Sequence, residues 1–238
     1  MTARYDVVLL DLDGTLTDSA PGILASVRHA YATLGLPLPA GSVLRGFVGP
    51  PLTESFAAHG VPAHRVDAAV AAYRDVYAAG RLLDNAVYPG VPECLTAVRT
   101  AGARLAVATS KPEPMARRIV AHLGLDTVLE RGLDDVFGAT LDGRISAKGE
   151  VVARALASLD ADADATGPRA TDLARAGRVV MVGDREHDVR GAAEHGIACV
   201  GVAWGYAYPG ELQRAGAIAV VGTPAELGDV LLDRAPVA

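Results

Sequence analysis

The feature that most constrains the fold is the sequence Asp-Leu-Asp-Gly-Thr-Leu at 11–16, directly after the mainly apolar run 5–10. The run predicts a buried strand. Because side chains alternate along a strand, Asp11 and Asp13 emerge on the same face at its carboxyl end. Gly14 lets the backbone turn sharply there. Two neighbouring carboxylates repel each other unless a cation lies between them or one keeps a proton. The segment therefore indicates chemistry rather than scaffolding.

Positive charge is distributed unusually along the chain. The chain has 22 lysines and arginines, but the only lysines are Lys111 and Lys148. An ammonium is a compact charge on a flexible stem, which a planar guanidinium cannot imitate. The two lysines therefore predict places where an ammonium is required, with chance survival in an arginine-biased composition as the alternative.

Composition limits the class of protein. At 238 residues the chain fits one large domain, or a core domain with a smaller insertion. The net charge of −6 argues against non-specific binding to nucleic acid or anionic membranes. Cys94 and Cys199 share no metal-ligand spacing, so we expect two buried reduced thiols. No signal peptide and no membrane-spanning run are recognisable, so we expect a cytoplasmic protein.

The first third of the chain predicts a small all-helical module over 16–84. Helical spacing of apolar residues at 21–31 is followed by a turn-rich linker at 35–41. Two further helices are expected at 52–59 and 65–79. We expect no strand in this part.

From residue 85 onward, strand and helix patterns alternate. Strands are expected at 104–109, 136–137, 179–182, 198–202 and 218–221, and helices at 91–101, 112–123, 148–159, 188–195 and 224–232. Alternation of this kind implies a parallel sheet with helices on both faces. The predicted fold class is α/β, a Rossmann-like doubly wound parallel sheet formed by 1–15 and 85–238. Residues 160–178 are expected to form a long surface loop.

Polar residues gather where the predicted strands end, which is where open parallel sheets form their sites. These residues are Asp11 and Asp13 after the first strand, Thr109, Ser110 and Lys111 after the second, Lys148 at the start of a helix, and Asp184 and Asp188 after the strand at 179–182. The free backbone N–H groups of the helix after Lys111 are suited to receive a phosphate.

These four motifs, in this order, resemble the haloacid dehalogenase superfamily, in particular its magnesium-dependent phosphatases with a helical cap inserted after the first motif. The resemblance covers nearly the whole chain. It implies that Asp11 is the nucleophile that attacks phosphorus and becomes an aspartyl-phosphate. It also implies that Asp13 protonates the leaving alcohol and then accepts a proton from the hydrolytic water.

The resemblance further implies a Mg²⁺ site formed by the Asp11 carboxylate, the Asp13 backbone carbonyl and Asp184. Asp188 would support this site directly or through water. It also fits a helix N-cap, and the two roles can coexist.

The remaining motif residues would bind the transferring phosphoryl group and the substrate. Thr109 would hydrogen-bond a phosphoryl oxygen, and Lys148 would neutralise developing negative charge and hold Asp11 ionised. Lys111 and Ser110 are assigned to substrate binding, with a helix N-cap as the alternative for Ser110.

Single residues separate some branches of the superfamily. The presence of Asp13 distinguishes the chain from the metal-free dehalogenases. The absence of lysine from the module at 16–84 distinguishes it from phosphonate hydrolases that use a cap lysine. The chain looks like the phosphoglycolate phosphatases, with details at 49–56, 141–144 and 183–188 closer to bacterial 5′-nucleotidases. Sugar-phosphate mutases share the core motifs and stay an alternative.

The helical module is expected to close over the core and to set specificity through Arg45 and the loop that begins at Gly49. A solvated surface charge is the alternative for Arg45. The expected partner is a small phosphorylated metabolite, and the expected assembly is a monomer or small homo-oligomer. A phosphate-binding regulatory protein is the non-enzyme alternative. Such a relative would be expected to have lost Asp11 or Asp184, and both are present.

Overall fold

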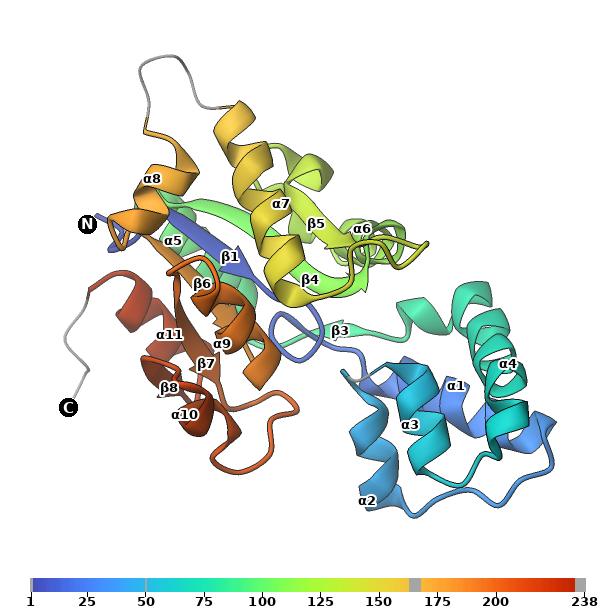
Figure 1. Ribbon diagram of the computed structural model, residues 1–238. Coiled ribbons are helices and arrows are strands. Elements are labelled where there is room, and N and C mark those ends of the chain that lie inside the picture. Colours follow the sequence, from blue (N-terminus) through green and yellow to red (C-terminus); the bar gives the residue numbers. More distant parts are fainter. Residues whose placement is uncertain (1, 50, 163–167, 234–238) are drawn as a thin grey trace. The chain divides into compact units, whose positions relative to one another are not determined.

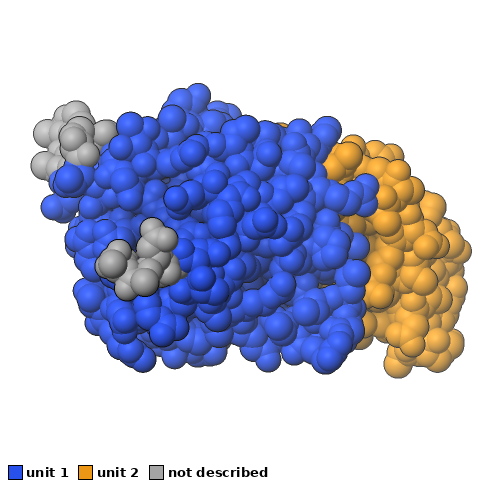
Figure 2. Space-filling model, turned by 90° about the horizontal axis from the view of Figure 1, so that it is seen from above, with its two compact units in different colours: residues 1–17, 87–238 blue, residues 18–86 orange. Residues whose placement is uncertain are grey.

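The computed structural model describes residues 2–49, 51–162 and 168–233. It divides into two compact units (Figure 2), one formed by residues 1–17 and 87–238 and the other by residues 18–86. The boundaries predicted from the sequence lie two residues earlier in each case. The chain passes between the units through β2 (Thr17–Asp18) and β3 (Ala86–Val87), which pair with each other. The expectation of no strand in the first third was therefore wrong for β2.

The described residues of unit 1 form a six-stranded sheet with the strand order β5-β4-β1-β6-β7-β8, and every described strand pair in it is parallel. The strands are β1 (Val7–Leu10), β4 (Arg104–Pro112), β5 (Val136–Ala139), β6 (Val179–Gly183), β7 (Ala198–Val202) and β8 (Ala219–Val221). This arrangement confirms the predicted α/β fold class.

Helices cover both faces of this sheet (Figure 1). They are α5 (Val91–Thr100), α6 (Glu113–His122), α7 (Lys148–Ala161), α8 (Ala170–Arg175), α9 (Glu186–Ala193), α10 (Glu211–Ala215) and α11 (Pro224–Leu231). Figure 1 shows α7 in front of the sheet and α5 behind it. Because both faces are covered, all four residues of β1 are buried.

Helix α8 corrects the long loop expected at 160–178, of which residues 163–167 lie outside the described part. The Asp160 carboxylate accepts hydrogen bonds from the backbone N–H and the hydroxyl of Thr171, at 3.0 and 2.7 Å. These bonds satisfy part of the first turn of α8, and Ala170 and Ala174 bury its inner face. A tertiary contact therefore stabilises a helix too short to be recognised from its own periodicity.

Unit 2 contains α1 (Ala20–Thr33), α2 (Gly41–Leu44), α3 (Leu52–Ala58) and α4 (Val66–Ala79), with short 3₁₀ helices after α2, before α4 and after α4. The rings of Tyr31, Phe47 and Phe56 meet in its core, with centroids 5.2 to 6.3 Å apart. The Tyr31 hydroxyl donates to the carbonyl of His59 at 2.8 Å. These aromatic rings supply buried apolar surface that the alanine-rich helices around them lack.

None of the helices in the described part of the chain combines the length and the apolar character that crossing a membrane requires.

Candidate active site

The site begins at β1, which lies between β4 and β6 in the sheet. Leu10, the last residue of β1, is in register with Val107 of β4 on one side and with Val182 of β6 on the other. The backbone N–H of Asp11 continues the pairing by donating to the Val182 carbonyl at 2.9 Å. The sheet therefore brings motifs from distant parts of the sequence to one edge.

Lys148, the first residue of α7, is buried between two carboxylates. Its Nζ lies 2.7 Å from Asp11 Oδ1, 2.8 Å from Asp188 Oδ1 and 3.0 Å from the Ala108 carbonyl oxygen. An ammonium has three donors, and these three oxygens match them in number. Gly191 of α9 makes this approach possible, because a Cβ there would lie 2.7 Å from Lys148 Cβ.

Asp184 is fully buried at the end of β6. Its Oδ2 accepts the backbone N–H of Tyr206 at 2.7 Å, and its Oδ1 accepts the hydroxyl of Thr15 at 3.4 Å. Gly14 and Gly205 pack against it, because a Cβ on either glycine would lie within 2.5 Å of an Asp184 atom. The loop after β7 and the turn after β1 thus fix the carboxylate from two sides.

Asp188 combines two tasks within the first turn of α9. Its Oδ2 accepts the backbone N–H of Arg185 at 3.0 Å, while its Oδ1 faces Lys148. The N-cap position of α9 belongs to Arg185, so the expectation that Asp188 is the N-cap residue was wrong by three positions. The carboxylate still satisfies the start of the helix, by reaching back to it from the third helical position.

The three buried carboxylates of Asp11, Asp184 and Asp188 form a cluster whose ligand oxygens all lie within 4.8 Å of one another. Among the described ion pairs, Lys148 is the one cation joined to them. Arg185, whose charge also acts on Asp184, is paired with Glu211 at 2.7 Å. Three carboxylates and one ammonium leave two negative charges uncompensated.

The pKa shifts of Asp184, Asp11 and Lys148 arise from the same burial and close spacing of charges. Burial raises the pKa of Asp184 well above its ordinary value, and the charges of Asp188 and Asp11 raise it further. Burial also raises the pKa of Asp11, against the opposing charge of Lys148. Burial alone would lower the pKa of Lys148, but the carboxylates of Asp11 and Asp188 raise it above the usual value for lysine. The site therefore favours a further positive charge.

Asp13 forms a second ion pair next to the cluster in sequence, two residues after Asp11. Its Oδ2 lies 2.5 Å from Lys111 Nζ. The buried hydroxyl of Thr109 hydrogen-bonds to Asp11 and accepts the backbone N–H of Lys111 at 3.2 Å. The structure thus brings Thr109 and Lys111 to the two aspartates that the sequence singled out.

The remaining substrate-binding assignments concern Ser110 in unit 1 and two residues of unit 2. Ser110 is exposed and is not a helix N-cap, because β4 continues to Pro112 through a register shift and Pro112 occupies the cap position of α6. Its assignment to substrate binding stays a prediction. Arg45 and Gly49 both lie exposed in unit 2, and their substrate-binding roles stay predictions.

The residues that hold the segment 183–188 in place were not predicted from the sequence. The Glu211 carboxylate accepts from the Arg185 guanidinium and from the backbone N–H groups of Glu186 and Tyr208, at 2.7 to 2.9 Å. The Trp204 indole donates to the Thr15 carbonyl at 3.1 Å. An isolated glutamate belongs to no recognisable motif, so the local sequence does not single out Glu211.

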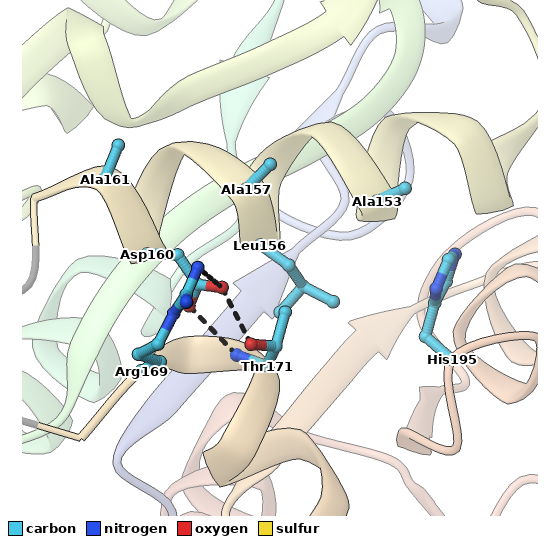
Figure 3. A pocket seen from close by; sticks show the side chains of 8 residues that line it. All are labelled: Ala153, Leu156, Ala157, Asp160, Ala161, Arg169, Thr171 and His195. Atoms are coloured by element: carbon cyan, nitrogen blue, oxygen red, sulfur yellow. Dashed lines mark hydrogen bonds and ion pairs between the residues drawn. The ribbon is translucent and has the colours of Figure 1, made fainter.

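A separate hollow of about 330 Å³ lies along the far half of α7 (Figure 3). Alanines and a leucine of α7 line it together with Asp160, Arg169, Thr171 and His195. None of the motif residues lines this hollow. The carboxylate of Asp160, which does line it, is already paired with Thr171 and Arg169. The carboxylate cluster lies elsewhere, at the carboxyl edge of the sheet.

The fold and the site define a Rossmann-like α/β protein with a carboxylate cluster where its central parallel strands end. The family model described as haloacid dehalogenase-like hydrolase matches residues 5–196, and the chain belongs to this family. The resemblance inferred from the four motifs is thereby confirmed.

The proteins that are similar to this chain are named for different activities. It is 45% identical over 200 residues to the tyrosine-protein kinase PtkA of Mycobacterium tuberculosis, covering 84% of this chain and 62% of that protein's length. It is 38% identical over 211 residues to a 5′-nucleotidase of Pseudomonas aeruginosa, covering 88% of each chain. The crystal structure of a predicted phosphatase from Clostridium acetobutylicum superposes with a TM-score of 0.80 at 34% identity, covering 96% of this chain and 99% of that one.

Proposed function

We propose that the protein is a magnesium-dependent phosphomonoester hydrolase that works through an aspartyl-phosphate on Asp11. The observation that carries this proposal is the charge of the buried cluster. Two uncompensated negative charges on closely spaced carboxylate oxygens match a divalent cation, and hard oxygen ligands favour Mg²⁺ over softer metals. Membership in a hydrolase family and the similarity to a 5′-nucleotidase support the same reading.

The proposed ligands of the ion are the carboxylates of Asp11, Asp184 and Asp188, with the backbone carbonyl of Asp13. When bound, Mg²⁺ supplies the positive charge that screens an anionic nucleophile from an anionic phosphate. The Tyr206 N–H and the Thr15 hydroxyl hold Asp184 in place for this purpose. Because both oxygens of Asp188 also contact Lys148 or Arg185, Asp188 links the cation site to Lys148.

The reaction then has two steps. A carboxylate oxygen of Asp11 attacks phosphorus, the bond to the leaving oxygen breaks, and Asp13 gives that oxygen a proton. A water then attacks the acyl phosphate, loses a proton to Asp13 and releases inorganic phosphate, which regenerates Asp11. Lys148 and Thr109 stabilise the charge that develops on the phosphoryl oxygens.

We expect the substrate to be a small phosphorylated metabolite, either phosphoglycolate or a nucleoside 5′-monophosphate. The test is phosphate release from a panel containing both, together with sugar phosphates, in Mg²⁺ and in excess EDTA. Turnover should require Mg²⁺ and should be abolished by Asp11→Asn. The matched control Asp172→Asn removes a carboxylate that is 58% exposed and should leave turnover unchanged. Turnover in EDTA, or an active Asp11→Asn variant, would contradict the proposal.

A second candidate is transfer of the phosphoryl group to a tyrosine instead of water. The observation that favours it is the 45% identity to a protein named as a tyrosine kinase. The same aspartyl-phosphate would serve, with a phenol hydroxyl replacing water in the second step. Incubation with ATP labelled at its terminal phosphate and a tyrosine-containing acceptor protein distinguishes the two, because a kinase yields labelled phosphotyrosine whereas a phosphomonoester hydrolase does not.

A further inference from the structure

Both lysines of the chain are buried against the two aspartates of the first motif. Lys148 Nζ lies 2.7 Å from Asp11 Oδ1, and Lys111 Nζ lies 2.5 Å from Asp13 Oδ2. The Lys111 side chain is only 6% exposed. The proposed function uses Lys148 directly, but it gives no reason for burying a second ammonium against the residue that transfers protons.

The two oxygens of the Asp13 carboxylate have different surroundings. Oδ2 accepts a hydrogen bond from Lys111, whereas Oδ1 is buried and has no hydrogen-bond partner among the described residues. A buried polar atom without a partner is unfavourable unless a water or a ligand group pairs with it. Oδ1 is therefore the oxygen that the described residues leave without a partner, so it can pair with a group that enters the site.

The Lys111 ammonium also decides which oxygen carries a proton. An ammonium has donors and no acceptor, so it pairs with an oxygen that has a lone pair facing it. While Oδ2 faces Lys111, the proton that Asp13 transfers is held on Oδ1. Lys111 is itself fixed at its base, because its backbone N–H donates to the Thr109 hydroxyl oxygen at 3.2 Å.

We propose that Lys111 is the positioning residue of the proton-transfer group: by holding Oδ2 of Asp13, it presents Oδ1 first to the leaving-group oxygen and then to the hydrolytic water. This inference rests on the proposed function. In the first step the proton moves from Oδ1 to the leaving oxygen as its bond to phosphorus breaks. In the second step a proton of the attacking water returns to Oδ1, so the cycle closes with Asp13 unchanged.

The test compares phosphate monoesters that differ in the acidity of their leaving alcohol. The phosphate is the only charged group in each of them. With a poor alkyl leaving group, Lys111→Met should lower kcat/KM about 100-fold, because proton transfer then limits bond cleavage. With 4-nitrophenyl phosphate, whose leaving phenolate needs little protonation, the loss should stay below about tenfold. A uniform loss across the series would overturn the inference, because a structural or substrate-binding role affects all these esters alike.

A double variant tests whether Lys111 acts through Asp13. Asp13→Asn combined with Lys111→Met should be no slower than Asp13→Asn alone, and a further loss would overturn the inference. Arg118→Met removes one positive charge from an exposed residue of the following helix, so it should leave the whole series unchanged. Where Lys111→Met does not fold, Lys111→Gln should show the same steepened dependence on the leaving group.

The outcomes also separate this inference from the proposed function. If the unmodified protein releases phosphate from none of the esters, the proposed function fails. If it releases phosphate and the Lys111 variants lose activity uniformly, only the positioning role fails.

Discussion

At the scale of single residues, the site depends on how many contacts one ammonium makes. Lys148 Nζ faces oxygens of Asp11, Asp188 and Ala108, and its side chain is 4% exposed. A planar guanidinium places its donors in a fork and needs more room, so it cannot satisfy three converging oxygens from the same position. The scarcity of lysine elsewhere in the chain fits this requirement.

Exchange of Lys148 for arginine should therefore reduce activity although the charge is kept. We expect Lys148→Arg to lower kcat about 100-fold or more, as expected for misplaced electrostatic stabilisation. Steady-state kinetics with a generic aryl phosphate measure the loss. The reverse exchange on the same helix, Arg154→Lys, should be nearly silent because Arg154 is 39% exposed. A Lys148→Arg variant with unmodified kcat would show that an ammonium is not required.

At the scale of secondary structure, the site depends on close packing between α7 and α9. Gly191 lets α9 approach the start of α7, since a Cβ at this position would lie 2.7 Å from Lys148 Cβ and 2.8 Å from the backbone nitrogen of Gly149. Backbone atoms cannot move aside as a flexible side chain would. The contact therefore ties the placement of Lys148 to the packing of two helices.

Gly191→Ala should destabilise the protein by about 1–3 kcal/mol and lower its activity, because overpacking displaces α7. The matched control is Gly228→Ala in α11, where the nearest atom would be Cys94 Sγ at an ordinary 3.6 Å. That control should be neutral or more stable by about 0.5–1 kcal/mol, because alanine favours helix more than glycine. Denaturant unfolding measures both. Equal effects of the two substitutions would refute the packing argument.

The sheet explains how much of the site was predictable from sequence. Asp11 and Asp184 follow strands, and Lys148 begins a helix, all with clear periodicity in the sequence. The carboxyl ends of parallel strands meet at one edge of the sheet, so these residues were expected to lie close together. The N-cap alternative for Ser110 was wrong because the register shift after Thr109 prolongs β4 to Pro112, and nothing in the local sequence indicates that shift. Helix α8 was missed because it depends on the contact with Asp160.

At the scale of the whole molecule, the buried cluster links stability to pH and metal. The pKa of Asp184 is raised well above its ordinary 3.8, chiefly by burial. A carboxyl with a raised folded pKa stabilises the fold below its unfolded pKa, and this contribution is lost as pH rises through the folded value. In the metal-free protein, the contribution of this cluster to the free energy of unfolding should therefore fall as the pH rises from about 4 through the folded pKa of Asp184.

Mg²⁺ should reverse this trend, because it binds the deprotonated carboxylates. At a concentration about 100 times its dissociation constant, the gain in unfolding free energy is about 2.7 kcal/mol. Thermal unfolding in EDTA and in Mg²⁺ should show a larger gain near pH 8 than near pH 5. Asp184→Asn should be more stable than the unmodified protein in EDTA and should not respond to Mg²⁺. The same Mg²⁺ response at both pH values, or in the variant, would contradict this linkage.

The most direct measurement of the central claim is a crystal structure of the protein with Mg²⁺ and beryllium fluoride, a stable mimic of an acyl phosphate. The account predicts beryllium bonded to a carboxylate oxygen of Asp11, with one Mg²⁺ coordinated by both Asp11 and Asp184. Beryllium fluoride bonded to another residue, or a Mg²⁺ ion that Asp184 does not coordinate, would contradict it.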